Sequence, residues 1–159
     1  MSKIDFNALR DRSYKCACDH GFHDTDLSNG HLLMLVITEL SEAVEADRKG
    51  KYFKGISTFE REFNRYSVLV DENKCFERAF EKCVKDTISD EMADAVIRLL
   101  DLAGALDISL EDIYDFMKEP EYKDWDDALK EMSFTERMFF LTSILTNDGD
   151  SRTPCGCVD

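Results

Sequence analysis

Proline is scarce in this sequence, with only 2 among 159 residues. Because proline disrupts the interior of a helix, its scarcity leaves room for long uninterrupted helices. Hydrophobic residues make up 43% of the chain and aromatic residues 11%. A chain of this length hides roughly 70% of its unfolded surface when it folds. These features predict one folded, helix-rich domain over residues 1–159.

Positive charge is also scarce, because 20 Lys and Arg residues face 34 Asp and Glu residues and leave a net charge of −14. No basic stripe interrupts the acidic composition. Binding of a nucleic-acid polymer depends on neutralising many phosphates, so this class of partner is disfavoured. A single nucleotide remains compatible, since a bound metal ion and a few local cations are enough to hold its phosphates.

Long apolar runs are absent as well. No run approaches the roughly 20 residues that a membrane span needs, and residues 1–12 carry charges throughout. We therefore expect a cytoplasmic protein without a membrane partner, in which the six cysteines are free thiols. The alternative is a four-thiolate zinc site built from two Cys-x-Cys pairs, although that spacing is unusual for zinc. The pairs are Cys16 with Cys18 and Cys155 with Cys157.

Two acidic pairs stand out against this background. Glu39 and Glu42 lie in an apolar stretch over residues 31–49, and Glu91 and Asp94 lie in a second one over residues 86–106. Residues three apart share one face of a helix, so each stretch presents two carboxylates side by side. The flanking Leu, Ile, Val and Ala residues indicate that both helices bury much of their surface.

Carboxylates close to a buried surface are costly unless they are paired or bound to a metal ion. If the two helices face each other, four carboxylates converge, and neither four-residue motif contains a cation. Mg²⁺ or Mn²⁺ would resolve the repulsion, because both ions prefer oxygen ligands. The alternatives are solvated surface acids or a structural network of ion pairs.

Three segments resemble the MazG-type branch of the all-α nucleoside triphosphate pyrophosphohydrolases, which carries ExxE on one helix and ExxD on a later one. The segments are GFHD at 21–24, LVITELSEAVEADR at 35–48 and KDTISDEMADAVIRLLDLA at 85–103. The resemblance covers about residues 20–118, which we take as the core. It implies an all-α, antiparallel helical bundle completed by oligomerisation.

The resemblance also implies Mg²⁺-dependent cleavage of a nucleoside triphosphate to the monophosphate and pyrophosphate. It assigns the metal to Glu39, Glu42, Glu91 and Asp94, and we expect Glu42 to act as general base. Phosphoribosyl-ATP cleavage remains a rival activity within the superfamily. A helical bundle that binds metal or nucleotide without turnover is the non-enzymatic alternative.

Four further residues are candidates for substrate binding. Phe22 and His23 lie in the loop that is near the nucleotide in the resembled branch, and they are candidates for stacking on the base. Arg98 follows Asp94 by one turn, so it would pair with a motif carboxylate or bind a phosphate oxygen. Lys118 matches a phosphate-binding Lys of many family members, but the Asn and Arg that follow it there are missing here. Asp101 is one turn beyond Arg98 and would extend the acidic stripe toward a second metal ion.

Capping residues, among them Thr58 and Asp71, and apolar spacing predict seven helices, and Pro120 is expected to end the sixth. Aromatic stripes at Phe59, Phe63 and Tyr66, and at Phe76 and Phe80, suit core packing or a subunit interface. We therefore expect a homodimer or homotetramer. Residues 147–159 are expected to form a mobile tail. The expected helices span residues 3–18, 28–50, 58–66, 71–83, 87–106, 109–118 and 133–146.

Overall fold

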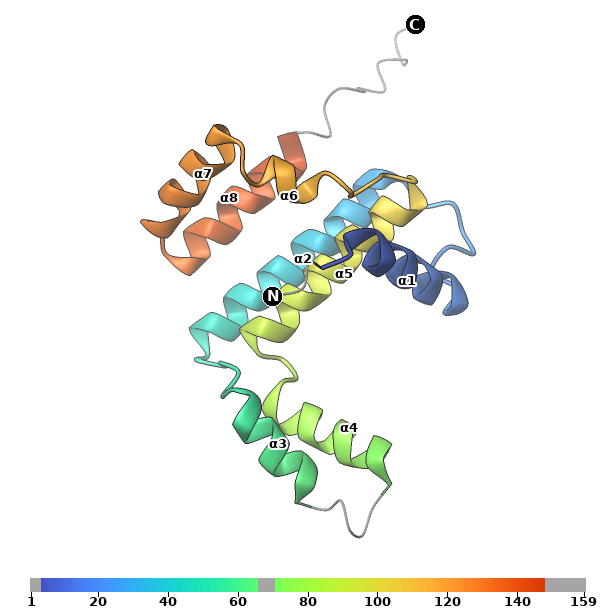
Figure 1. The fold of residues 1–159 in the computed structure, drawn as a ribbon, viewed down its shortest axis with the longest axis vertical. Coiled ribbons are helices and arrows are strands. Elements are labelled where there is room, and N and C mark those ends of the chain that lie inside the picture. The colour runs from blue at the N-terminus through green and yellow to red at the C-terminus, as the bar shows by residue number, and fades with distance from the viewer. Residues whose placement is uncertain (1–3, 66–70, 148–159) are drawn as a thin grey trace, which may run out of the picture.

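A computed structural model of the chain describes residues 4–65 and 71–147 and shows an all-helical protein in these ranges (Figure 1). The expectation of an all-α fold is confirmed. The expected tail beyond residue 147 and the Tyr66 position lie outside the described residues. The helices are α1 (Phe6–Asp19), α2 (Asn29–Arg48), α3 (Ile56–Asn64), α4 (Glu72–Cys83), α5 (Ile88–Ala105), α6 (Ile113–Phe116), α7 (Pro120–Lys130) and α8 (Phe134–Asn147).

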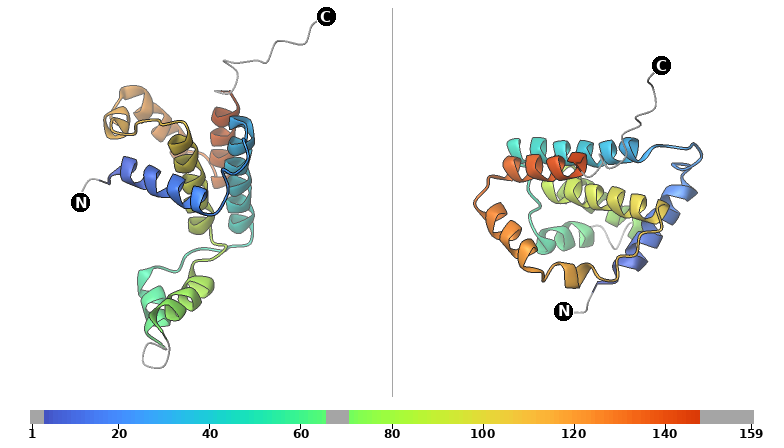
Figure 2. Two further views of the ribbon diagram at one scale, coloured as in Figure 1. Left: turned by 90° about the vertical axis from the view of Figure 1, so that its right-hand side faces the viewer. Right: turned by 90° about the horizontal axis from the view of Figure 1, so that it is seen from above.

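Helices α2 and α5 form the centre of the fold and run antiparallel (Figure 1). Their direction follows from two pairings, since Ile88 N donates to Lys51 O while Arg98 contacts Glu39 at the middle of both helices. The core cluster contains Val36 and Leu40 of α2, Ala95 of α5 and Met138 of α8. Helix α8 lies along α2 (Figure 2), so the core extends past the expected limit at residue 118.

The ends of both acidic helices match their sequence signals. Ser28 caps α2 by accepting from His31 N, and Thr87 caps α5 by accepting from Asp90 N. Helix α2 ends at Arg48, and Gly50 two residues beyond adopts a left-handed φ of 65° that a residue with a side chain rarely takes. These local signals fix where each acidic pair stands along its helix.

Helix α1 crosses α5 at very close range. A Cβ atom added to Gly104 would lie 2.5 Å from the Cβ atom of Tyr14, so only glycine permits this approach. Arg10 secures the crossing by donating from Nη1 to Ile108 O at 2.7 Å. The crossing places α1 beside the carboxyl-terminal half of α5.

Helices α3 and α4 form a hairpin that packs chiefly on itself and projects from the α2–α5 pair (Figures 1 and 2). Phe59 lies 6.4 Å from Phe63 and 5.6 Å from Phe76, measured between ring centroids. Asp71 caps α4 as expected. The predicted cap at Thr58 is wrong, because Gly55 occupies the N-cap position of α3 and the Thr58 hydroxyl donates to Lys54 O.

The segment after α5 departs most from the sequence prediction. In place of a helix over residues 109–118, α6 contains only four residues. Pro120 was expected to end that helix, but it begins α7, a helix that was not predicted. Proline is compatible with the first position of a helix, because a backbone N–H at that position would have no partner within the helix. Helix α8 was predicted correctly, with Ser133 and Glu136 forming reciprocal capping bonds.

Within the described ranges, no helix combines the length and the apolar character that crossing a membrane would require.

Candidate functional site

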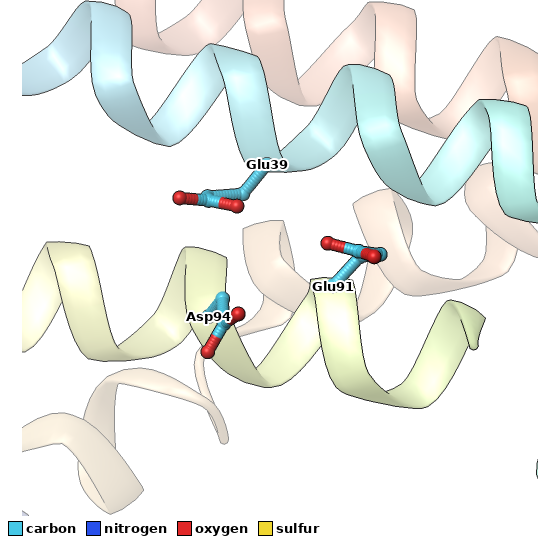
Figure 3. A group of neighbouring side chains, drawn as sticks. All are labelled: Glu39, Glu91 and Asp94. Carbon is cyan, nitrogen blue, oxygen red and sulfur yellow. The ribbon is translucent and has the colours of Figure 1, made fainter. Parts of the chain in front are cut away.

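Three of the four predicted metal ligands converge between α2 and α5 (Figure 3). Glu39 points from α2 toward Glu91 and Asp94 of α5, and one oxygen from each carboxylate lies within 4.8 Å of the others. Oxygen atoms at this separation can share one hard divalent cation. The antiparallel packing of the two helices thus brings together acids that are 52 residues or more apart in sequence.

Glu91 is the most strongly perturbed member of this acidic trio. Its residue is 7% exposed, and burial together with the negative charges of the neighbouring carboxylates raises its pKa from 4.5 to about 7. Burial is the largest cause, followed by the charge of Glu42. A carboxyl group in this environment is partly protonated at neutral pH, so a cation that binds there displaces a proton.

Asp94 is less buried than Glu91, but burial and the charges of Asp90 and Glu39 also raise its pKa. Arg98 opposes that effect. Its Nε atom lies 3.2 Å from Glu39 Oε1, and its guanidinium lies 5.5 Å from the ring centre of Phe22. Of the two roles expected for Arg98, the structure shows the pairing with a motif carboxylate.

Glu42 lies outside the acidic trio. It is exposed and lines a cleft of about 190 Å³ beside Glu91, together with Lys49 and Lys51. The two lysines form ion pairs at this cleft, Lys49 with Glu45 and Lys51 with Asp86, each at 3.1 Å. Glu42 therefore stands next to the trio without joining it.

A second cleft, of about 300 Å³, opens on the Asp94 side of the trio between α1 and α5. One part of its wall is formed by Phe22 and Arg98. Another part is formed by Cys16 of α1 and by His20, the C-cap of α1. The residue Phe22 is 51% exposed, so its ring remains accessible for stacking. The trio thus separates a cleft with an aromatic ring and a guanidinium from a cleft with two lysines.

The side chains of His23 and Asp101 pair with each other in the structure. His23 Nε2 lies 2.7 Å from Asp101 Oδ1, and the imidazole packs on Tyr14 with 5.0 Å between ring centroids. The side chains of His23 and Asp101 are only 20% and 9% exposed. This pair anchors the loop that carries Phe22. Base stacking by His23 and a metal role for Asp101 stay predictions.

Lys118 lines neither cleft beside the trio and forms an ion pair with Asp115 on the exposed surface near α6. Sequence reasoning missed Lys49 and Lys51, the cations that do lie beside the site. One signal was available, because Lys49 follows Glu42 by seven residues and therefore lies two turns further along the same helical face.

The cysteines that the structure describes are thiols, namely Cys16, Cys18, Cys75 and Cys83. Cys155 and Cys157 lie outside the described residues, so the zinc alternative stays a prediction.

The donor set fits a hard cation, because three carboxylates gather where burial and mutual repulsion penalise their charges. Comparisons of this chain with protein-family models, curated proteins and solved structures found no match. The described residues form an all-α protein with an acidic trio between two antiparallel helices and a cleft on each side of the trio.

Proposed function

We propose that the protein is a Mg²⁺-dependent nucleoside triphosphate pyrophosphohydrolase, with Mn²⁺ as a possible substitute, which releases the monophosphate and pyrophosphate. One observation carries the proposal: Glu39, Glu91 and Asp94 converge from the two predicted motifs, with oxygens within 4.8 Å of one another. One acid of the first motif and both acids of the second therefore meet across the helix interface.

A divalent cation held there would neutralise phosphate charge and lower the pKa of water. Glu39, Glu91 and Asp94 are the proposed ligands. Glu42 remains the proposed general base, since it stands beside Glu91 on an open cleft where water has access. A base outside the ligand set keeps its lone pairs available for a proton.

The two clefts suggest how a triphosphate lies across the trio. The Asp94 cleft suits the nucleoside, because Phe22 offers an aromatic face and Arg98 a planar cation. The Glu42 cleft suits the released phosphates, because Lys49 and Lys51 supply positive charge there. Both lysines would exchange their present carboxylate partners for phosphate oxygens, and they replace Lys118 as the proposed phosphate ligands.

The remaining parts of the proposal are cytoplasmic location and assembly into a homodimer or homotetramer. Support for assembly comes from the α3–α4 hairpin, which projects from the core and leaves Ile56 63% and Phe76 52% exposed. Apolar surface of this kind commonly marks a subunit interface.

The decisive experiment identifies products. Purified protein is incubated with Mg²⁺ and a panel of normal and modified nucleoside triphosphates, with chelator-treated protein as control. We expect pyrophosphate to appear in step with the monophosphate, and only with the metal. A diphosphate with orthophosphate would contradict the proposal, and saturable nucleotide binding without any product would favour a non-catalytic bundle.

A further inference from the structure

A separate aromatic cleft of about 310 Å³ lies at the junction of α6 and α7, and it shares no lining residue with the two clefts beside the acidic trio. Its walls are Phe116, Tyr122 and Trp125, with Pro120 and Glu119 completing the lining. We propose that this cleft binds a small organic cation of the quaternary ammonium class, with the aromatic rings around the methylated nitrogen and Glu119 supplying the counter-charge.

The aromatic rings form the corner that such a cation needs. Phe116 and Tyr122 lie 5.9 Å apart between centroids with their planes inclined at 62°. Trp125 is braced by Phe140 at 6.3 Å and 82°, which holds its ring in place. Phe116 remains 58% exposed and Trp125 47% exposed, so large parts of both rings are accessible to a ligand. The negative faces of aromatic rings attract cations.

Glu119 is placed to supply the opposite charge. It occupies the N-cap position of α7, yet its side chain makes no capping hydrogen bond to that helix. No Lys or Arg is among the residues that line the cleft within the described part of the chain.

The surrounding sequence selects a cation over other occupants. Residues 111–131 contain nine carboxylates and three lysines, which leaves a formal charge of −6. A second copy that met this face with the same segment would bring another formal charge of −6 against it, and like charges repel. A hydrated metal ion or a primary ammonium holds its water more strongly than a methylated nitrogen does, so the aromatic walls favour the methylated nitrogen. The cleft volume is that of a small-molecule site.

The chain contains a single tryptophan, Trp125, so its fluorescence reports on this cleft alone. The full chain is titrated with choline at constant ionic strength, alongside 3,3-dimethylbutan-1-ol, the neutral isostere of choline. We expect a saturable change with choline and at least a tenfold weaker response to the neutral alcohol. Equal responses to both compounds, or no saturable response to choline, would overturn the proposal.

Two variants separate charge from shape. Glu119→Gln keeps the side-chain volume and should weaken choline binding at least threefold, whereas Glu131→Gln, an exposed acid outside the cleft, should leave it unchanged. Tyr122→Leu should abolish the response, with unchanged helicity by circular dichroism as the folding control. Undiminished binding by Glu119→Gln would overturn the role of charge. Trp125 emission that depends on protein concentration without ligand would show that a second copy occupies the cleft, and would overturn the proposal too.

Discussion

The α2–α5 pair and the α3–α4 hairpin are both antiparallel helix pairs with a carboxylate at the interface. The pKa of that carboxylate is shifted in opposite directions in the two pairs. In the hairpin, the Glu62 side chain is 13% exposed and lies 2.7 Å from Lys82 and 3.5 Å from Arg65. Hydrogen bonding to Lys82 lowers its pKa. Between α2 and α5, Glu91 is surrounded by other carboxylates, and its pKa rises to about 7.

The partners of the two carboxylates separate a structural acid from a candidate site. The hairpin neutralises Glu62 with cations of its own chain, so nothing further is required there. The α2–α5 interface concentrates negative charge, and its cation Arg98 pairs with Glu39. The burial of Glu91 and its repulsion by neighbouring carboxylates are therefore left uncompensated. An excess of buried like charge is stable only if protons or cations from solution balance it.

The largest effect expected from this contrast concerns activity. Asp94→Asn keeps the shape of the side chain and removes one proposed ligand charge, so pyrophosphate release should fall about 100-fold or more. The same variant should lose most of the rise in melting temperature that Mg²⁺ gives the wild type, a rise that corresponds to about 2.7 kcal/mol at a hundredfold excess over Kd. Calorimetry and product analysis measure both.

The matched control for that variant is Asp26→Asn, which removes one exposed charge from the loop before α2. It should keep both the activity and the Mg²⁺ response. An active Asp94→Asn protein with an unchanged Mg²⁺ response would place the metal site elsewhere.

The second effect is a pH dependence of stability in the metal-free protein. Glu91 binds its proton more tightly in the folded state than in the unfolded state. Its contribution to the free energy of unfolding is therefore fully present below pH 4.5 and is lost as the pH rises toward about 7. A tenfold change in the protonation equilibrium is worth about 1.4 kcal/mol, so the loss amounts to about 3 kcal/mol. Urea unfolding at a series of pH values measures it.

Glu91→Gln removes the titrating group and should flatten this dependence, which makes the metal-free variant more stable than the wild type at pH 7. The opposite outcome is a wild-type stability that rises over the same pH range, with a parallel rise in the variant. It would show that ionisation of Glu91 does not destabilise the folded state.

The smallest effect belongs to the hairpin and has the opposite sign. Because the pKa of Glu62 is lowered, its contribution is present above pH 4.5 and is lost as the solution becomes more acidic. Glu62→Gln should therefore weaken the protein at neutral pH and reduce its sensitivity to acid. Thermal unfolding from acidic to neutral pH provides the test. An increase in neutral-pH stability on this substitution would erase the contrast between the two helix pairs.

Much of the fold could be predicted from local sequence because its signals act within one helical turn. A side-chain oxygen accepts a hydrogen bond from a nearby backbone N–H at the helix starts capped by Ser28, Asp71 and Thr87. Gly50 follows the end of α2 with a positive φ. The predicted helix ends agree with the structure at these positions. The predictions failed at Thr58, where Gly55 is the N-cap instead, and around Pro120, where the same residue is compatible with the end of one helix and the start of the next.

Local sequence is enough to predict the two acidic helices and the spacing that puts each acidic pair near one face. Which carboxylates meet depends on how the helices pack. Residues three apart on a helix differ by about 60° around its axis, so the rotation of α2 that buries Val36 and Leu40 turns Glu39 toward α5 and leaves Glu42 on the neighbouring cleft. The same packing pairs His23 with Asp101, and no local pattern could reveal that contact across 78 residues.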